Sequence, residues 1–344
     1  MPGTFRFSFG PWNIHEGADP FGPPVRPTVA FAEKLKLYKK MGFDGVQFHD
    51  DDAVPQLNHM SPAQVEKAAR EMAKLLDGEG LVAEIVAPRL WEDPRTIDGG
   101  YTSNNPVERQ YAIDRSLQTV DIARALNCDK VVLWLAREGT YIREAKDATK
   151  AVELLVTAIN KMLAHDSAIK ILIEPKPNEP MDLAYIPTIG HAIGLSYVTS
   201  DPGRVGALVE SAHAILAGLD PSDEMAYALA HKKLWSVHLN DQNGLKFDQD
   251  KAFGAVDLRR AFMQVWVLDR NGFGNNGEFV GLDVKAMRTQ KAEVAALHLS
   301  NSREIFLSLL EVVRGLDQSR IDELIAQRNY EQLEMEIIRA LLGK

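Results

Sequence analysis

Eight short apolar runs recur along the 344-residue chain, and they constrain its fold more than any other feature. Most are unbroken, as in the segments VVLW and ILIE, which is typical of parallel strands buried on both faces. We predict strands at Phe5–Phe9, Gly45–His49, Leu81–Ala87, Lys130–Trp134, Ile169–Glu174, Val205–Val209, Trp235–His238 and Phe279–Asp283. Amphipathic stretches between them predict helices at Val29–Met41, Ser61–Gly78, Pro106–Leu126, Lys146–Ala164, Thr188–Leu195, Asp223–Lys232, Leu258–Leu268 and Lys291–Gly315.

Eight strand–helix units in one chain of this size indicate an α/β protein with a TIM (β/α)8 barrel. An open, doubly wound sheet is the alternative, but no GxGxxG motif follows the first predicted strand. We assign residues 1–315 to the barrel as a catalytic domain. Residues 316–344 are rich in Arg, Glu and Leu and predict a short C-terminal helical extension. Because the barrel is already complete without it, we expect this tail to lie at a subunit interface.

Composition excludes several classes of protein. Apolar residues make up 45% of the chain and charged residues 25%, as in ordinary globular proteins. The formal net charge of −9 is unfavourable for binding nucleic acid, and no apolar run approaches the roughly 18 residues of a membrane span. The lone Cys128 excludes a disulfide within the chain, and the N-terminus lacks a basic-then-apolar signal. We therefore expect a cytoplasmic protein with no nucleic-acid or membrane partner.

Polar side chains gather at the predicted strand ends, where TIM barrels place their catalytic residues. They are His49, Glu174, Lys176, Glu210, His213, His238, Asp248, Asp250 and Asp283. A single strand-end Glu is more often an ion-paired or capping group, and the segment KFDQD on its own could be a solvated acidic loop. Together, however, so many carboxylates at one rim would repel one another and be costly to desolvate. Divalent cations resolve this conflict, and oxygen-rich sites with imidazoles suit Mg²⁺, Mn²⁺ or Co²⁺.

Several segments resemble the xylose isomerases, from the first predicted strand to the eighth helix. They are FSFGPW, DPFG, GVQFHDDDAVP, DGGYTSN, VVLWLAREG, IEPKPNEP and GLKFDQDKAFG. The resemblance implies a metal-dependent aldose–ketose isomerase that opens the sugar ring and then shifts a hydride between C1 and C2. It also implies two divalent metal ions per subunit: Mn²⁺, Co²⁺ or Mg²⁺. One would be held by Glu174, Glu210, His238 and Asp283, and the second by Glu210, His213, Asp248 and Asp250.

The same resemblance implies roles for the other site residues. His49, oriented by Asp52, would assist ring opening, and Lys176 would bind the O1 oxygen and stabilise charge there. An apolar wall that excludes water would be formed by Trp12, Trp91 and Trp134. Phe21 would reach into the site of a neighbouring subunit, so we expect a homo-oligomer, either a dimer or a tetramer, whose partner molecule is a small aldose or ketose.

The chain departs from the xylose isomerase pattern at positions that bear on metal and sugar choice. His238 stands where an aspartate is usual, and its HLND context resembles L-rhamnose isomerases. A nitrogen ligand favours Mn²⁺ or Co²⁺ over Mg²⁺. Ala87 replaces a usual substrate-binding threonine, and Arg89–Leu90–Trp91 replaces a polar stretch that usually ends in Phe. An aldose other than xylose, such as L-rhamnose or another 6-deoxy sugar, is therefore an alternative substrate.

Functions of other classes remain open from the sequence. A sugar epimerase on the same barrel would move a proton between two carboxylates around one metal, without the HDDD and KFDQD segments. A metal-dependent hydrolase, like an apurinic-site endonuclease, would need cations along the rim to bind phosphates, whereas this rim is acidic. A non-catalytic sugar- or metal-binding protein is the remaining alternative. Incorporation of solvent hydrogen into the product would distinguish proton transfer from a hydride shift.

Overall fold

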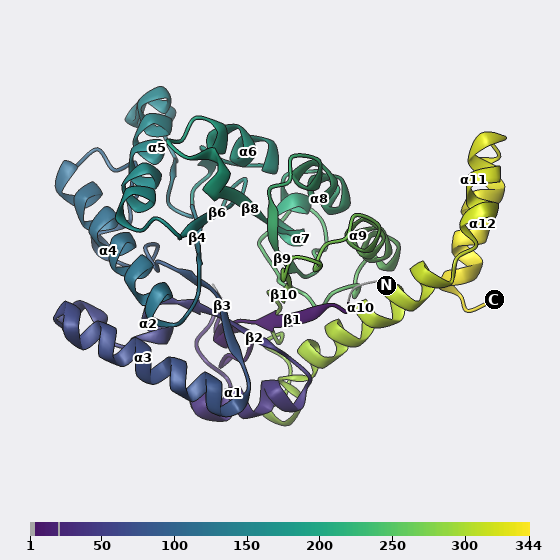
Figure 1. Ribbon diagram of the computed structural model, residues 1–344, viewed down its shortest axis with the longest axis horizontal. Helices are drawn as coiled ribbons and strands as arrows, with labels where there is room; N and C mark the ends of the chain where they lie inside the picture. Colours follow the sequence, from purple (N-terminus) through teal and green to yellow (C-terminus); the bar gives the residue numbers. More distant parts are fainter. Residues whose placement is uncertain (1–3, 20) are drawn as a thin grey trace.

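Eight parallel strands close into a barrel in the computed structural model, which describes residues 4–19 and 21–344 (Figure 1). The strands are β1 (Arg6–Phe9), β2 (Gly45–His49), β3 (Val82–Ala87), β4 (Lys130–Trp134), β6 (Lys170–Glu174), β8 (Val205–Glu210), β9 (Leu234–Leu239) and β10 (Phe279–Leu282). β1 pairs with both β2 and β10, so the sheet has no open edge. All eight predicted strands and the TIM barrel are confirmed, and the open doubly wound sheet is excluded.

Helices surround the barrel, as the amphipathic stretches predict (Figure 1). They are α1 (Phe31–Lys40), α3 (Pro62–Glu79), α4 (Pro106–Ala125), α5 (Ala148–His165), α6 (Ile189–Tyr197), α8 (Pro221–Ala230), α9 (Leu258–Arg270) and α10 (Leu297–Gly315). Ser61 begins α3 with a capping box, and Pro62 occupies its first turn. α10 begins later than predicted, because residues 292–294 form a separate 3-10 turn. Also absent from the predictions are the short helices α2 (Asp50–Ala53) and α7 (Ser211–Leu216) and an antiparallel pair, β5 (Gly139–Thr140) with β7 (Leu183–Ala184).

Strand register determines which side chains meet at the barrel mouth. His49 pairs with Ala87, Trp134 with Glu174, and Glu210 with His238. Because side chains alternate along a strand, the inward residue two positions earlier on a strand lies one layer deeper. That deeper layer contains a separate apolar cluster whose buried members include Ile85, Val132, Leu172 and Leu208. The side chains that end β3, β4 and β6, and Glu210 on β8, therefore stand above an apolar floor.

A β-bulge between β2 and β3 places one carboxylate inside the barrel. The register shifts between Val46 and Gln47, so Glu84 is the extra residue on β3. Glu84 accepts hydrogen bonds from Gln47 Nε2 at 3.0 Å and from Ser236 Oγ at 2.7 Å, and from Ser8. These donors satisfy a carboxylate that is 2% exposed. The group belongs to the hydrogen-bonded packing inside the barrel.

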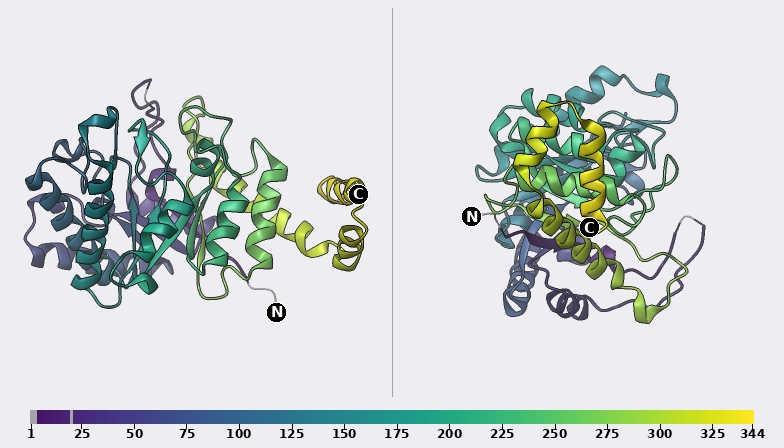
Figure 2. Two further views of the ribbon diagram at one scale, coloured as in Figure 1. Left: turned by 90° about the horizontal axis from the view of Figure 1, so that it is seen from above. Right: turned by 90° about the vertical axis from the view of Figure 1, so that its right-hand side faces the viewer.

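The C-terminal residues form two further helices, α11 (Gln318–Ala326) and α12 (Tyr330–Leu341), that extend beyond the barrel from the end of α10 (Figure 2). Ile321, Leu324 and Ile337 are the buried positions of this pair. The predicted helical extension is thus present, and its place at a subunit interface stays a prediction. Every helix in the described part of the chain is too short or too polar to span a lipid bilayer.

Candidate active site and metal centre

The barrel mouth holds a pocket of about 520 Å³ at the carboxyl ends of the strands. It is lined by every predicted site residue except Asp52 and Phe21. One side of the pocket is charged, and we name it the ligand half. Its residues lie at or just after the ends of β6, β8, β9 and β10: Glu174, Glu210, His238 and Asp283, with His213, Asp248 and Asp250 beside them. The other four strands supply the side we name the aromatic half: Trp12, His49, Ala87, Trp91 and Trp134.

Glu210 is the centre of the ligand half. Its carboxylate belongs to three groups of side chains whose ligand atoms lie within 4.8 Å of one another. These groups are Glu174 with Glu210 and His213, Glu210 with His238 and Asp283, and Glu210 with Asp248 and Asp250. A carboxylate has two oxygens and can bind a different ion with each, so the position of Glu210 suits a shared ligand.

The two imidazoles lie among the carboxylates. His238 Nδ1 is 3.1 Å from Glu174 Oε1 and 3.8 Å from Asp283 Oδ2. His213 Nε2 is 3.3 Å from both Glu210 Oε1 and Asp248 Oδ2. Asp248 Oδ1 is buried without a hydrogen-bond partner, which is costly unless a cation or a ligand occupies that direction. The mixture of oxygen and imidazole donors, with this orphaned oxygen, fits divalent cations.

The pKa shifts of the carboxyl groups in the cluster also favour a cation site. Burial raises the pKa of Glu210 well above its usual value, and Asp248 and Asp283 raise it further. Burial and the charge of Asp248 likewise raise the pKa of Asp250. Burial also opposes ionisation of Glu174, but the neighbouring His238 outweighs it and lowers the pKa of Glu174 to about 2. The side chains present cannot all ionise together, whereas added cations would allow them to.

Lys176 lies at the edge of the ligand half, close to the pocket. Its Nζ is 2.8 Å from Asp248 Oδ2 and 3.2 Å from Glu179 Oε2, and 5.3 Å from the centre of the Trp134 ring. Burial lowers the pKa of Lys176, but the Asp248 and Glu179 carboxylates outweigh burial and raise it. The ammonium is therefore charged at neutral pH and faces both halves of the pocket.

Two supporting residues are absent from the predictions. Asn240 donates to Glu210 Oε1 at 2.9 Å and to Asp250 Oδ1 at 3.2 Å, which links the carboxylates of two of the groups. Lys285 forms an ion pair with Asp250. Asn240 directly follows β9, two residues after His238, and Lys285 lies three residues after β10 and two after Asp283. That spacing was visible in HLND and DVK, but an amide and a lysine are too common on loops to be singled out.

The aromatic half is a row of rings in contact. Ring centroids are 4.4 Å apart for Trp12 and His49, 5.0 Å for His49 and Trp91, and 4.5 Å for Trp91 and Trp134. Trp12 Nε1 donates to Asp283 Oδ1 at 2.8 Å, so this row is joined to the ligand half. The structure thus brings the three predicted tryptophans together at one wall of the pocket.

His49 is held from behind by two groups of opposite charge. Its Nδ1 lies 2.8 Å from Asp52 Oδ2, as the expected pairing requires. The same nitrogen lies 2.7 Å from Arg89 Nη2, a contact that sequence reasoning did not anticipate. Arg89 also binds Asp51 Oδ1 at 2.8 Å, so its guanidinium is fixed beside the histidine.

Phe21 does not line the pocket of its own chain. It is 80% exposed in the loop before α1, which projects from the barrel (Figure 2), and its ring is 5.8 Å from that of Phe247, a residue of the pocket lining. Its entry into a neighbouring subunit stays a prediction.

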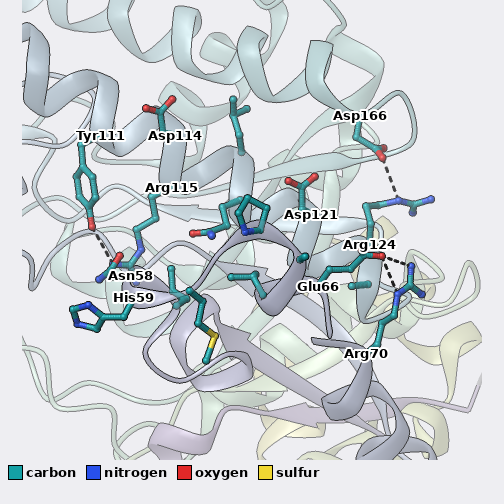
Figure 3. Close-up of a pocket in the computed structure, with 18 of the residues that line it drawn as sticks. Asn58, His59, Glu66, Arg70, Tyr111, Asp114, Arg115, Asp121, Arg124 and Asp166 are labelled. Carbon is teal, nitrogen blue, oxygen red and sulfur yellow. Dashed lines mark hydrogen bonds and ion pairs between the residues drawn. The ribbon is translucent and has the colours of Figure 1, made fainter. Parts of the chain in front are cut away.

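A larger groove of about 1060 Å³ lies on the outside of the barrel between α3 and α4 (Figure 3). Most of its charged side chains are in ion pairs, within the groove or with residues beside it. Glu66 binds Arg70 at 2.8 Å, and Arg124 binds Asp166 at 3.3 Å. Arg115 is committed to Asp50 at 2.8 Å. Among the described residues, no group with metal-ligand geometry lines this groove, so the barrel mouth is the candidate site.

Comparison with known proteins gives relatives along most of the chain. Residues 35–271 match the family model described as xylose isomerase-like TIM barrel. The xylose isomerases of Thermus thermophilus and Thermus caldophilus are each 32% identical over 327 residues, which is 93% of this chain and 83% of each relative.

Solved structures of low sequence identity share the fold. A 3-keto-D-glucoside 4-epimerase from E. coli matches with a TM-score of 0.62 at 14% identity, covering 88% of this chain and 100% of that one. A D-tagatose 3-epimerase-like protein matches with a TM-score of 0.63 at 16% identity, covering 90% and 98%. A xylose isomerase domain protein from Alicyclobacillus acidocaldarius matches with a TM-score of 0.60 at 14% identity, covering 91% and 100%. On the family model and the Thermus relatives, this chain belongs to the xylose isomerase-like TIM barrel family.

Proposed function

We propose that this protein is a metal-dependent aldose–ketose isomerase that works by ring opening and a 1,2-hydride shift. The observation that carries the proposal is the shared position of Glu210, around which the other carboxylates and imidazoles lie within reach of two ions. Lys176 and the row of aromatic rings beside this cluster supply the other parts that such a reaction needs. The similarity to Thermus xylose isomerases over 93% of the chain supports the same reaction class.

The proposed ligand sets match two of the three side-chain groups around Glu210, each with one residue added from the third group. Glu210, His238 and Asp283 would hold one ion together with Glu174, and Glu210, Asp248 and Asp250 would hold the other together with His213. Glu174 and His213 nevertheless fall in one group with Glu210, so in the proposed site they would lie at the boundary between the two ions. Bound divalent ions would orient and polarise the hydroxyls of the open-chain sugar.

The side chains of the protein divide the remaining work. His49 presents its ring to the pocket, with Asp52 behind it, and is placed to assist proton movement as the sugar ring opens. The Lys176 ammonium would bind O1 and stabilise negative charge that develops there. Trp12, Trp91 and Trp134 would exclude water, which matters because water would exchange protons with an enediolate and divert the reaction from hydride transfer.

A sugar epimerase is the second candidate function. The observation that favours it is the single group of Glu174, Glu210 and His213, which offers two buried carboxylates around one ion position. An epimerase would invert a carbon by moving a proton between such carboxylates. It would leave Asp248, Asp250 and Lys176 without a clear task, so we favour the isomerase.

The test is product formation from a panel of aldoses with metal-stripped protein that is resupplied with Mn²⁺, Co²⁺ or Mg²⁺. The panel contains xylose, glucose, rhamnose, lyxose, ribose and allose. We expect ketose to form only when metal is present, and no solvent deuterium to enter the product carbon. Deuterium incorporation with inversion of a carbon would replace the isomerase by the epimerase. Conversion of no sugar with any metal would contradict both.

A further inference from the structure

The barrel mouth has one small side chain in a ring of large ones. Ala87 ends β3, directly paired with His49 on β2, while Trp134 ends β4 and Glu174 ends β6. Ala87 is 8% exposed and lines the pocket. A methyl group at a level where its neighbours carry an imidazole and an indole leaves a recess, which we name the Ala87 recess.

The floor of the Ala87 recess is apolar. Ile85 and Val132 line its floor and are 2% and 1% exposed. They pack with Ala87 in the same cluster inside the barrel, together with Leu172 and Leu208. None of these side chains carries a hydroxyl, an amide or a charge. A ligand hydroxyl that entered this floor would lose its bonds to water and gain no partner there.

Two arginines of the aromatic half have partners outside the recess. Arg89 is bound to Asp51 and to the His49–Asp52 pair, and Arg137 Nε donates to the Trp91 carbonyl oxygen at 3.1 Å. The indole N–H of Trp134 is a nearby donor that is buried without a partner among the described residues. The Ala87 recess therefore offers mainly apolar contact area, and its adjacent polar groups are this indole N–H and the His49 ring.

The position of the recess relative to the ligand half follows from the strand order. In the closed ring β1-β10-β9-β8-β6-β4-β3-β2, β3 and β9 are four strands apart and lie opposite each other. Ala87 at the end of β3 thus faces across the mouth toward His238 on β9. A sugar whose first hydroxyls are held in the ligand half would therefore extend its far carbon toward the Ala87 recess.

We propose that the preferred substrate is a 6-deoxy aldose, whose terminal methyl group occupies the Ala87 recess. The inference rests on the proposed isomerase function and adds the class of sugar to it. A methyl group gains apolar contact with Ile85, Ala87 and Val132, whereas a terminal CH₂OH must bury an unpaired hydroxyl. Discrimination by an apolar pocket against one added hydroxyl is limited to about 100-fold.

The experiment compares sugars that differ only in the terminal hydroxyl. Two such pairs are L-rhamnose with L-mannose and 6-deoxy-D-glucose with D-glucose. In whichever pair is converted faster, we expect kcat/KM to be about 10- to 100-fold higher for the deoxy sugar than for its hydroxylated counterpart. Binding of the linear alditols L-rhamnitol and L-mannitol to metal-loaded protein gives the same comparison without turnover, and we expect the deoxy alditol to bind more tightly.

Two isosteric variants separate volume from polarity. Ala87→Val and Ala87→Thr fill the recess equally, but only the threonine adds a hydroxyl that can pair with the sugar. Both variants should lower kcat/KM for the deoxy sugar. For the hydroxylated sugar, kcat/KM should be about 10-fold higher in Ala87→Thr than in Ala87→Val. Trp134→Phe should leave the preference for the deoxy sugar unchanged, because the recess and not the indole N–H sets it.

The outcomes distinguish this inference from the proposed function. Ketose formation with equal or better rates for the hydroxylated sugars would overturn the 6-deoxy assignment and leave the isomerase intact. Loss of discrimination in Trp134→Phe would also overturn it, because the indole would then be reading the terminal group. Absence of ketose from every sugar would contradict the isomerase itself.

Discussion

The two halves of the barrel mouth are built by the same strand geometry but have opposite chemistry. In the ligand half, the strand-end positions carry Glu174, Glu210 and His238, and burial together with nearby carboxylates raises the pKa of Glu210. In the aromatic half, the equivalent positions carry His49, Ala87 and Trp134, and the rings of His49 and Trp134 contact those of Trp12 and Trp91. A sugar also has two faces, with hydroxyl groups and C–H groups, so a divided mouth can hold its oxygens on one side and exclude water on the other.

Removing the shared carboxylate should have the largest effect. We expect Glu210→Gln to lose metal and to reduce kcat/KM by more than about 10³-fold, because changes outside the ligand shell alone cost 10- to 100-fold. Metal content by mass spectrometry and initial rates measure the two effects. Glu66→Gln, an exposed helix carboxylate paired with Arg70, is the control and should behave as wild type. Full metal content in Glu210→Gln would show that Glu210 is not a shared metal ligand.

Lys176 tests whether the two halves act on the same substrate, since it contacts both. We expect Lys176→Met to lower kcat by about 10²- to 10³-fold while metal content and the far-ultraviolet spectrum stay unchanged, because its role is to stabilise charge at O1. Metal binding itself should compensate the Asp248 carboxylate that loses its partner. A near-normal kcat would show that the ammonium serves only to neutralise Asp248.

The stability of the fold next to the aromatic half should also fall in acid, because of the buried neutral histidine His298. Burial lowers the pKa of His298 to about 4, and the ring bonds the Asn13 carbonyl oxygen, next to Trp12, at 2.8 Å. The unfolded chain binds a proton near pH 6.5, so between these values the unfolded state holds more protons and stability falls as pH falls. We expect a loss of up to about 3 kcal/mol as pH drops from 6.5 to 4.

Urea unfolding at several pH values measures this loss, with His298→Gln as the comparison. The glutamine can donate to the same carbonyl oxygen but does not titrate, so its stability curve should be flatter by that amount. Identical pH dependence in the two proteins would mean that His298 does not contribute to the loss of stability in acid.

The sequence predicts the ligand half better than the aromatic half, for a physical reason. Buried parallel strands give unbroken apolar runs, so the eight strands and the polar residues that end them could be placed in order. Metal-ligand types are rare enough at strand ends to be recognised individually. Asn240 and Lys285 are common loop residues, and the contact of Arg89 with His49 depends on how the loop after β3 folds back.

The Ala87 recess and the β-bulge at Glu84 show the other limit of sequence reasoning. Ala87 was visible as a departure, but its recess exists only because register places His49 and Trp134 beside it. Glu84 lies in the barrel because one residue of β3 has no partner on β2. Both features arise from pairing between strands, and the pattern within a single strand does not contain that information.

His238 offers the smallest and sharpest test of the ligand half. Its imidazole lies where it could give an ion a nitrogen donor, 3.1 Å from Glu174 and 3.8 Å from Glu210 and Asp283. Nitrogen donors favour Mn²⁺ and Co²⁺ over Mg²⁺, so we expect His238→Asp to shift the ratio of Mg²⁺- to Mn²⁺-supported kcat/KM toward Mg²⁺ by about tenfold. His231→Asp, which changes a half-buried histidine at the C-terminal end of α8 outside the pocket, is the control. An unchanged ratio in His238→Asp would mean that the imidazole acts through its hydrogen bond to Glu174 and not as a ligand.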